Sequence, residues 1–138
     1  MPASKQSSRR KLAKLRAELH ATPWSIDVRA FGMLTSAIET GDLESVKATL
    51  CLGQDSCESI CKIINGIAVI PVTGVLCDEV NFMVRWGYAS SYQQLERDFK
   101  AALDNSQIRA IVFYCDTPGG SAIGCKRLAD QVFKARGK

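Results

Sequence analysis

A run of mostly apolar residues leads directly into a glycine turn, and this pair of features limits the possible folds most. Residues 108–115 read Ile-Arg-Ala-Ile-Val-Phe-Tyr-Cys, and residues 116–121 read Asp-Thr-Pro-Gly-Gly-Ser. A near-continuous apolar run of this length is typical of a strand inside a parallel sheet. Apolar residues then recur at helical spacing over residues 123–133. The pattern predicts a buried strand, a tight loop and a helix.

The elements before this loop alternate in the same way. Residues 62–64 and 67–72 are apolar on either side of Asn65-Gly66, which favours a type I′ hairpin between two strands. Pro71 cannot donate to a ladder and indicates an edge or a bulge. Ser91 is a candidate N-cap for a helix over residues 92–103, which carry one apolar stripe. From residue 62 onward the order predicts an α/β layer with right-handed crossovers.

The residues before this layer divide into two further segments. Residues 1–21 are expected to form a basic flexible tail, because residues 1–20 hold six Lys and Arg against one acid. Of the chain's 18 basic and 14 acidic residues, 12 and 13 then remain for the rest, which argues against nucleic-acid binding by the folded part. Residues 22–61 are expected to be a helical leader and linker, with its best helix over residues 27–39.

Targeting signals and metal motifs are missing from the sequence. The amino-terminal segment has no apolar core of a signal peptide and no run long enough to span a membrane, so a cytoplasmic location in a bacterial host or a procapsid is expected. The six cysteines form no CxxC pair, and the one histidine is His20 in the tail. We therefore expect no metal site and no cofactor, and most cysteines are expected to be small core residues.

The glycine loop is the candidate functional element. It lies at the carboxyl end of a predicted strand, where α/β proteins place ligands, and two successive glycines let the backbone approach a ligand closely. Backbone N–H groups at the start of the next helix would suit an oxyanion hole. A structural alternative is a Pro-Gly-Gly turn with Ser121 as the helix N-cap. A Walker loop and a dinucleotide fingerprint are both excluded, because Cys125 and Ser121 stand where Lys and Gly are required.

The combination of motifs resembles one peptidase family. Residues 67–76 (Ile-Ala-Val-Ile-Pro-Val-Thr-Gly-Val-Leu), Ser91-Tyr92 at a helix start and the strand leading into 116–120 (Asp-Thr-Pro-Gly-Gly) are similar to the amino-terminal part of S49 peptidases, the group of signal-peptide peptidases and phage head-maturation proteases. The resemblance covers residues 65–137. These peptidases typically have Ser where this chain has Thr117. The leader around Thr22-Pro23-Trp24 points to the phage and prophage branch.

This resemblance implies a fold and a site. The fold would be a ClpP/crotonase-like stack of strand-strand-helix units over residues 62–138, incomplete at its carboxyl end. Gly119 and Gly120 would contribute to the oxyanion hole, with Asp116 and Pro118 shaping the loop. The family's Ser nucleophile and Lys general base would lie beyond Lys138, so no catalytic residue is assigned within the chain, which is expected to be inactive alone.

The resemblance also implies substrates and partners. They would be polypeptides, including head or scaffold proteins, and the protein would form a homo-oligomer. An apolar cluster between the second strand and the first helix of the domain could line a substrate groove or pack in the core; its members are Phe82, Met83 and Trp86.

Two other functions remain open at this stage. A crotonase-type acyl-CoA enzyme would share the fold and would also direct glycine-loop donors at a carbonyl oxygen, although Asp-Thr-Pro-Gly-Gly favours the peptidase. A non-catalytic assembly protein, left by a truncated gene, would keep the fold without the chemistry.

Overall fold

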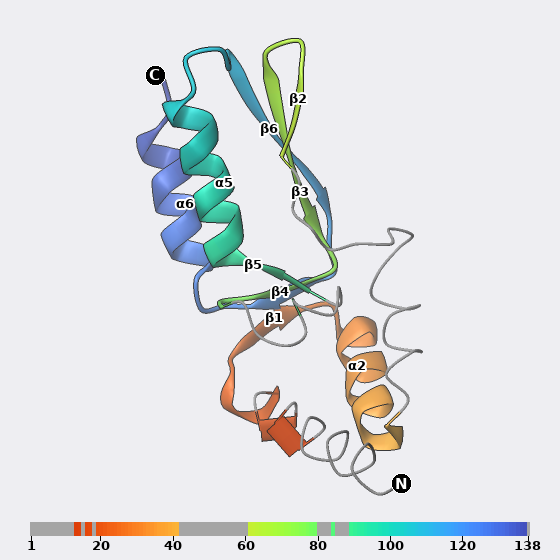
Figure 1. Cartoon of the computed structure of the whole chain (residues 1–138). Coiled ribbons are helices and arrows are strands. Elements are labelled where there is room, and N and C mark those ends of the chain that lie inside the picture. The colour runs from red at the N-terminus through yellow and green to blue at the C-terminus, as the bar shows by residue number, and fades with distance from the viewer. Residues whose placement is uncertain are drawn as a thin grey trace, which may run out of the picture.

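The computed structural model describes residues 13–14, 16–17, 19–41, 61–79, 84 and 89–137 of the chain. These residues form a mixed α/β fold with a three-stranded sheet, a four-stranded sheet and helices packed at both ends (Figure 1). The α/β prediction is confirmed. The weak helical pattern at 43–50 and the polar stretch at 53–59 lie outside the described residues.

The three-stranded sheet has the order β2-β3-β6 and is called the larger sheet because two of its strands have seven residues. β2 (Lys62–Ile64) and β3 (Ile67–Thr73) form the predicted hairpin, in which Asn65 and Gly66 both have positive φ, 51° and 78°. β6 (Ala110–Asp116) pairs with β3 in parallel over seven residues, from Ile67 and Ala110 to Thr73 and Asp116. β2 pairs only with residues 67–69. Among the described residues, no strand pairs with Pro71 on that side, so its missing N–H costs no ladder bond there.

The four-stranded sheet has the order β1-β7-β4-β5 and is called the smaller sheet because each of its strands has only three residues. They are β1 (Trp24–Ile26), β4 (Val75–Cys77), β5 (Ala89–Ser91) and β7 (Gly119–Ser121). β4 follows β3 after Gly74, and β7 follows β6 after Thr117 and Pro118. Two chain segments that pair in the larger sheet therefore turn together and pair again in the smaller one, at Leu76 and Gly120.

Two helices cover one face of the larger sheet. α5 (Tyr92–Asp104) and α6 (Cys125–Lys134) lie side by side against β3 and β6 (Figure 1). Ser91 is the N-cap of α5, as predicted: its hydroxyl accepts a bond from the Gln94 N–H, 3.3 Å away. The Gln94 side chain completes no capping box but donates to Asp98 one turn later. The core between helices and sheet contains Ile70, Val72, Leu76, Tyr92, Leu95 and Phe99.

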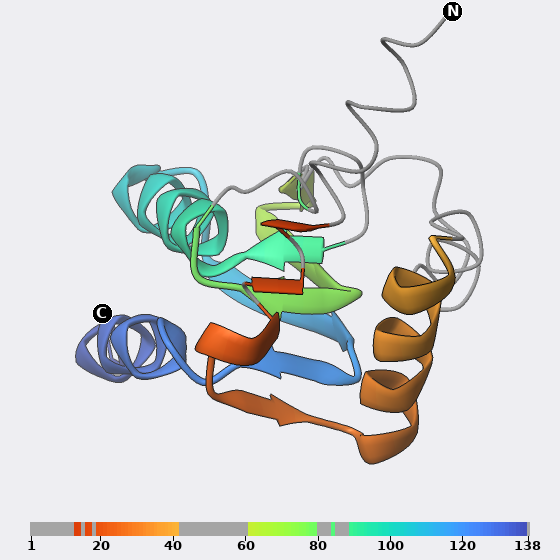
Figure 2. The same cartoon turned by 90° about the horizontal axis from the view of Figure 1, so that it is seen from below.

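A second core lies at the opposite end of the molecule, under α2 (Val28–Thr40) (Figure 2). The helix predicted over residues 27–39 begins at its N-cap Asp27 and ends at Gly41, which has a φ of 76°. Its buried side chains pack against the smaller sheet and against one residue of the amino-terminal segment; the buried members are Leu19, Leu34, Ala37, Ile38, Val75, Cys77 and Ala89.

Burial on the larger sheet differs from the expectation in one respect. The apolar residues 67–72 would suit a strand covered on both faces, but β3 alternates: Ala68, Ile70 and Val72 are buried, while the side chains between them are only half-buried. On β6, Val112 and Tyr114 are 46% and 59% exposed. The helices cover one face, and α2 packs on the smaller sheet instead of on the second face.

The cysteines also differ from the expectation. Cys77 is buried and Cys61 is half-buried, but Cys115 and Cys125 are exposed, and these four described cysteines are not joined in disulfides. Cys51 and Cys57 lie outside the described residues. The core role therefore applies to Cys77 and in part to Cys61.

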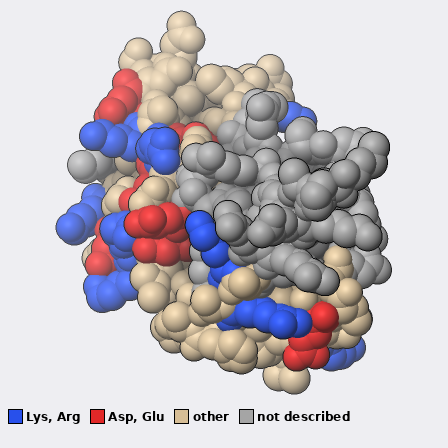
Figure 3. Space-filling view, turned by 60° about the horizontal axis from the view of Figure 1, so that its bottom comes forward, with Lys and Arg blue, Asp and Glu red and all other residues tan. Residues whose placement is uncertain are grey.

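Charged side chains of both signs are interspersed on the face seen in Figure 3. On α6, Lys126 pairs with Asp130, and Arg127 bonds to both Asp78 and Glu96. Among the described residues, no helix is both long and apolar enough to cross a membrane.

The core under α5 leads to a direct test of this fold. Leu95 is fully buried on α5, and Leu103 is 43% exposed on the same helix. We expect Leu95→Ala to lower the free energy of unfolding by about 2–5 kcal/mol, through lost burial and the cavity left behind. Leu103→Ala is the control and should cost less than about 1 kcal/mol. Urea unfolding of both variants measures the difference, and equal losses would contradict the placement of α5.

Candidate functional site

The glycine loop lies at the corner where the two sheets meet. The Gly74 N–H donates to the Asp116 carbonyl, 3.1 Å away, and the Thr117 hydroxyl donates to the Gly74 carbonyl. Gly74 has a φ of 67°, a conformation that glycine adopts at little cost. These two bonds join the turn after β3 to the turn after β6. Thr117 therefore fixes the position at which β7 begins, a role that the sequence did not indicate.

Both glycines lie in the strand β7, not at a helix N-terminus. We expected the loop to lead directly into the next helix, but α6 begins four residues after the strand, at Cys125, with Gly124 as its N-cap. The helix dipole therefore does not act on Gly119 and Gly120 in the expected way. Ser121 is likewise not a helix N-cap: its buried hydroxyl accepts a bond from the Ile123 N–H, 3.1 Å away, and closes a short turn.

Close approach of neighbouring strands explains why both positions are glycine. A Cβ on Gly119 would overlap the Ser25 carbonyl oxygen and lie 3.0 Å from the Ile26 Cα, both in β1. A Cβ on Gly120 would overlap the backbone of Leu76 in β4. Gly119 also has a φ of 104°. Protein backbone on both sides therefore occupies the space that two glycines leave open.

The two glycine N–H groups have different surroundings. The Gly119 N–H donates to the Thr117 hydroxyl, 3.1 Å away, within the loop. Gly120 lies opposite Ser25 in the antiparallel pair of β1 and β7. The assignment of both N–H groups to an oxyanion hole stays a prediction, and Gly120 is the stronger candidate because its N–H is not used within its own loop.

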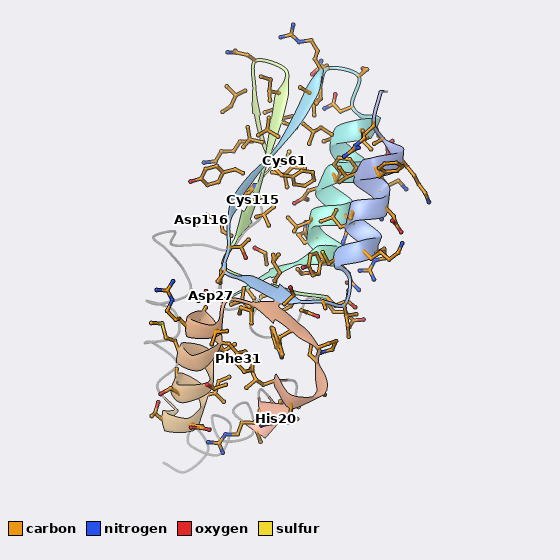
Figure 4. The ribbon with its side chains drawn as sticks, turned by 180° about the vertical axis from the view of Figure 1, so that it is seen from behind. His20, Asp27, Phe31, Cys61, Cys115 and Asp116 are labelled. Atoms are coloured by element: carbon orange, nitrogen blue, oxygen red, sulfur yellow. The ribbon has the colours of Figure 1, made fainter. Side chains whose placement is uncertain are left out.

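Pro118 and Asp116 each accept a backbone bond through the carbonyl group, and their role in shaping the loop stays a prediction. The Pro118 carbonyl accepts a bond from the Asp27 N–H, 2.9 Å away, and the Asp116 carbonyl accepts the bond from Gly74. Asp27 and Asp116 lie near the junction of the two sheets in Figure 4, and His20 lies at the far end of the molecule from Asp116. Among the described residues, no His, Cys, Asp and Glu side chains gather into a group that could hold a metal.

The proposed groove residues Phe82, Met83 and Trp86 lie outside the described residues. A polar cluster of Arg127, Asp78 and Glu96 lies at the start of α5 and α6. Arg127 donates to Asp78 Oδ1 over 2.9 Å and to Glu96 Oε1 over 2.6 Å. These bonds connect the end of β4 to both helices. Sequence reasoning missed the cluster, because its three members are far apart in the chain.

Tyr92 is buried beside this cluster, and burial raises the pKa of its hydroxyl above the ordinary value of 10.0. The neighbouring Cys125 thiol raises it further. Burial is the larger cause, since the ionised phenolate would lose its hydration inside the core. Tyr92 therefore stays protonated well into the alkaline range and acts as a packing residue.

The glycine contacts predict a large effect on stability. Gly120→Ala should lower the free energy of unfolding by about 2–4 kcal/mol, because the new methyl group must displace the Leu76 backbone. Gly32→Ala is the matched control: it lies within α2 with nothing within 4 Å, so it should raise stability by about 0.5–1 kcal/mol. Thermal and urea unfolding measure both. A Gly120→Ala chain as stable as the wild type would contradict the strand packing around β7.

The raised pKa of Tyr92 predicts an alkaline loss of stability. Because the folded-state pKa lies above the unfolded value of 10.0, its contribution is complete below pH 10.0 and is lost as the pH rises beyond it. The slope approaches about 1.4 kcal/mol per pH unit. Tyr92→Phe should remove this part of the slope in urea unfolding between pH 9 and pH 11, roughly the range around the ordinary tyrosine value. Tyr114→Phe, at an exposed position, is the control and should keep the full slope.

Comparison with known proteins finds two phage head proteins. The chain is 33% identical over 75 residues to the head-tail preconnector protein GP5 of Enterobacteria phage P21, and 28% identical over 75 residues to the capsid assembly protease C of Escherichia phage lambda. Each match covers 54% of this chain, but only 15% and 17% of the two relatives. No family model matches the chain, and no solved structure matches it. Part of the chain is therefore similar to proteins of phage head assembly, one of them a protease.

Proposed function

We propose that the chain is the oxyanion-side part of a serine endopeptidase of the S49 type that acts in phage or prophage head maturation. The observation that supports this most is the corner at Gly120. β6 ends at Asp116 and leads through Thr117 and Pro118 into Gly119-Gly120 of β7, and the Thr117 hydroxyl bonds to both Gly74 and Gly119. The similarity to the capsid assembly protease C supports the same proposal.

The chemistry assigned to the chain is the stabilisation of charge. When a nucleophile attacks a peptide carbonyl, negative charge develops on its oxygen, and a donor fixed beforehand stabilises that charge. The Gly120 N–H would serve as this donor. β7 is held by its pairing with β4 and by the Thr117 hydroxyl, which bonds to Gly74 and Gly119, so the donor needs no reorganisation when the charge develops. No cofactor or metal enters this mechanism.

The nucleophile and the general base would come from residues beyond Lys138, according to the family resemblance. A lysine can act as base only when its pKa is lowered by burial, and the serine must lie within hydrogen-bond reach of it. We therefore expect no hydrolysis by the chain alone. Its fold would be the amino-terminal part of a ClpP/crotonase-like domain, its substrates would be head or scaffold polypeptides, and its functional state would be a homo-oligomer.

A second candidate is a non-catalytic assembly protein. The similarity to the head-tail preconnector protein GP5 favours it, since that name describes a part of the head and not an activity. The two candidates differ in whether the glycine corner stabilises a reaction. An acyl-CoA enzyme of the crotonase type gains no support from either relative.

A hybrid protein tests the proposal. Residues 1–138 are joined to the part of the capsid assembly protease C of phage lambda that follows its matching segment, and hydrolysis of labelled casein is measured. Hydrolysis is expected from the hybrid and not from the chain alone. A hybrid that unfolds cooperatively but hydrolyses nothing would contradict the peptidase and favour the assembly protein.

A matched pair at Thr117 then tests the role of the corner. Thr117→Val keeps the shape of the side chain but loses the bonds to Gly74 and Gly119, so the hybrid should lose about tenfold in kcat with little change in KM, less than for the loss of an oxyanion donor itself. Thr117→Ser keeps the hydroxyl and should retain most activity. Equal activity of the Val and Ser variants would contradict the role of the Thr117 hydroxyl bonds to Gly74 and Gly119.

A further inference from the structure

The amino-terminal strand β1 covers the free edge of the glycine strand. β1 runs antiparallel to β7, with Trp24 opposite Ser121, Ser25 opposite Gly120 and Ile26 opposite Gly119. Two further bonds extend the pairing at its ends: the Asp27 N–H donates to the Pro118 carbonyl over 2.9 Å, and the Ala122 N–H donates to the Pro23 carbonyl over 2.8 Å. β7 therefore has a backbone partner on the side away from β4.

The register determines which atoms of β1 face Gly120. Hydrogen-bonded and non-hydrogen-bonded pairs alternate along an antiparallel ladder. Residues 27 and 118 are a hydrogen-bonded pair at one end, and residues 23 and 122 are one at the other end. Ser25 and Gly120, midway between them, are therefore also at a hydrogen-bonded position. The Gly120 N–H consequently faces the carbonyl of Ser25.

β1 thus presents to Gly120 the group that a peptide substrate would present. It is extended, it pairs through its backbone, and its Ser25 carbonyl lies on the N–H that the proposed function assigns to the substrate carbonyl. Addition of an extended peptide to a sheet edge uses these same main-chain bonds, and side chains of the peptide add specificity. The glycines of β7 have no side chains that would select one strand sequence over another.

β1 is held by its backbone pairing with β7 and also by contacts with the leader. The Trp24 indole N–H donates to the Leu19 carbonyl over 2.8 Å, and its ring lies 6.2 Å from the ring of Phe31 in α2. Asp27 caps α2 through bonds to the N–H groups of Arg29 and Ala30. β1 is a three-residue edge strand, and Ser25 is exposed. The core under α5 contains no residue of β1, so β1 can leave β7 without breaking that core, while α2 remains packed against Val75, Cys77 and Ala89.

We propose that β1 is an autoinhibitory strand, which occupies in cis the docking edge for an extended polypeptide on β7, so that β1 must leave before a peptide can bind. The inference rests on the proposed function only in naming the bound peptide as a substrate. The binding itself requires no catalytic residue and can be measured with the 138-residue chain.

Proline at position 25 is the sharpest test. Ser25→Pro removes the N–H that faces β7, while Ser25→Ala keeps it and changes only an exposed side chain. The probe is a fluorescein-labelled peptide, Ac-Lys-Thr-Val-Thr-Val-Thr-Lys-NH2, whose sequence is unrelated to β1. Its control has proline in place of the first valine. We expect Ser25→Pro to bind the probe at least tenfold more tightly than the wild type, and the Ala variant to resemble the wild type.

Amide hydrogen exchange locates the effect. In the wild type the Gly120 amide should be protected, and Ser25→Pro should exchange it about tenfold faster, while amides of β3 and β6 keep their rates. Addition of the probe should restore protection at Gly120, and the proline-containing peptide should not. A folded Ser25→Pro chain that binds the probe no better than the wild type would overturn the proposal, with β1 then a permanent strand of the sheet.

A second pair of variants tests the proposal independently, in case proline at position 25 unfolds the chain. Asp27→Ala removes the cap of α2 and so weakens the junction between β1 and α2 without a change at β7, and Asp27→Asn keeps a capping side chain. Probe binding should rise about fivefold in the Ala variant and stay near the wild type in the Asn variant. No gain in a folded Asp27→Ala chain would overturn the proposal equally.

The hybrid with the lambda protease separates this inference from the proposed function. Ser25→Pro in the hybrid should raise the hydrolysis of casein severalfold. Hydrolysis without such a rise, together with unchanged probe binding, would overturn the autoinhibitory role of β1 and would still support the peptidase function. Tighter probe binding without any hydrolysis would overturn the peptidase function and would still support the displacement of β1 by a peptide.

Discussion

The close approach of three backbones at Gly119 and Gly120 is the constraint on which the rest of the structure depends. β7 has β1 on one side and β4 on the other, and a Cβ at either glycine would overlap one of these strands. β4 continues from the central strand of the larger sheet, and β1 leads into α2. The four-stranded sheet therefore connects two cores, and it can do so only because β7 lacks side chains at its centre.

The corner between the sheets makes this arrangement rigid. β3 and β6 are paired in parallel up to Thr73 and Asp116, and the Thr117 hydroxyl and the Gly74 N–H then tie the two turns together. If either turn moved alone, the pairing of Leu76 with Gly120 would be lost. Rotation of β7 is thus coupled to the larger sheet and, through Arg127, Asp78 and Glu96, to the helices. A donor on β7 is held more firmly than a donor on an isolated loop would be.

The sequence predicted the elements whose signals are local. The Asn65-Gly66 hairpin, the Ser91 cap of α5 and the helix that begins at Asp27 each depend on residues a few positions apart, and all are present. The strands β1, β4 and β7 were not predicted as a sheet, because three residues carry no period and Trp24 pairs with Ser121 across most of the chain. For the same reason the expected helix dipole at the glycines was wrong, since nothing in the sequence separates β7 from a loop.

The two interpretations of the glycines, as packing residues and as a ligand site, differ less than the sequence suggested. A glycine that admits a neighbouring strand and a glycine that admits an extended peptide need the same empty space and offer the same N–H. What distinguishes them is whether the neighbour can leave. β4 cannot, because it continues the central strand β3 and its residues are buried. β1 is an edge strand with an exposed centre, held by Trp24 and by the cap at Asp27. Gly120 is therefore a structural residue toward β4, where its missing side chain makes room for Leu76, and it is available for function only toward β1.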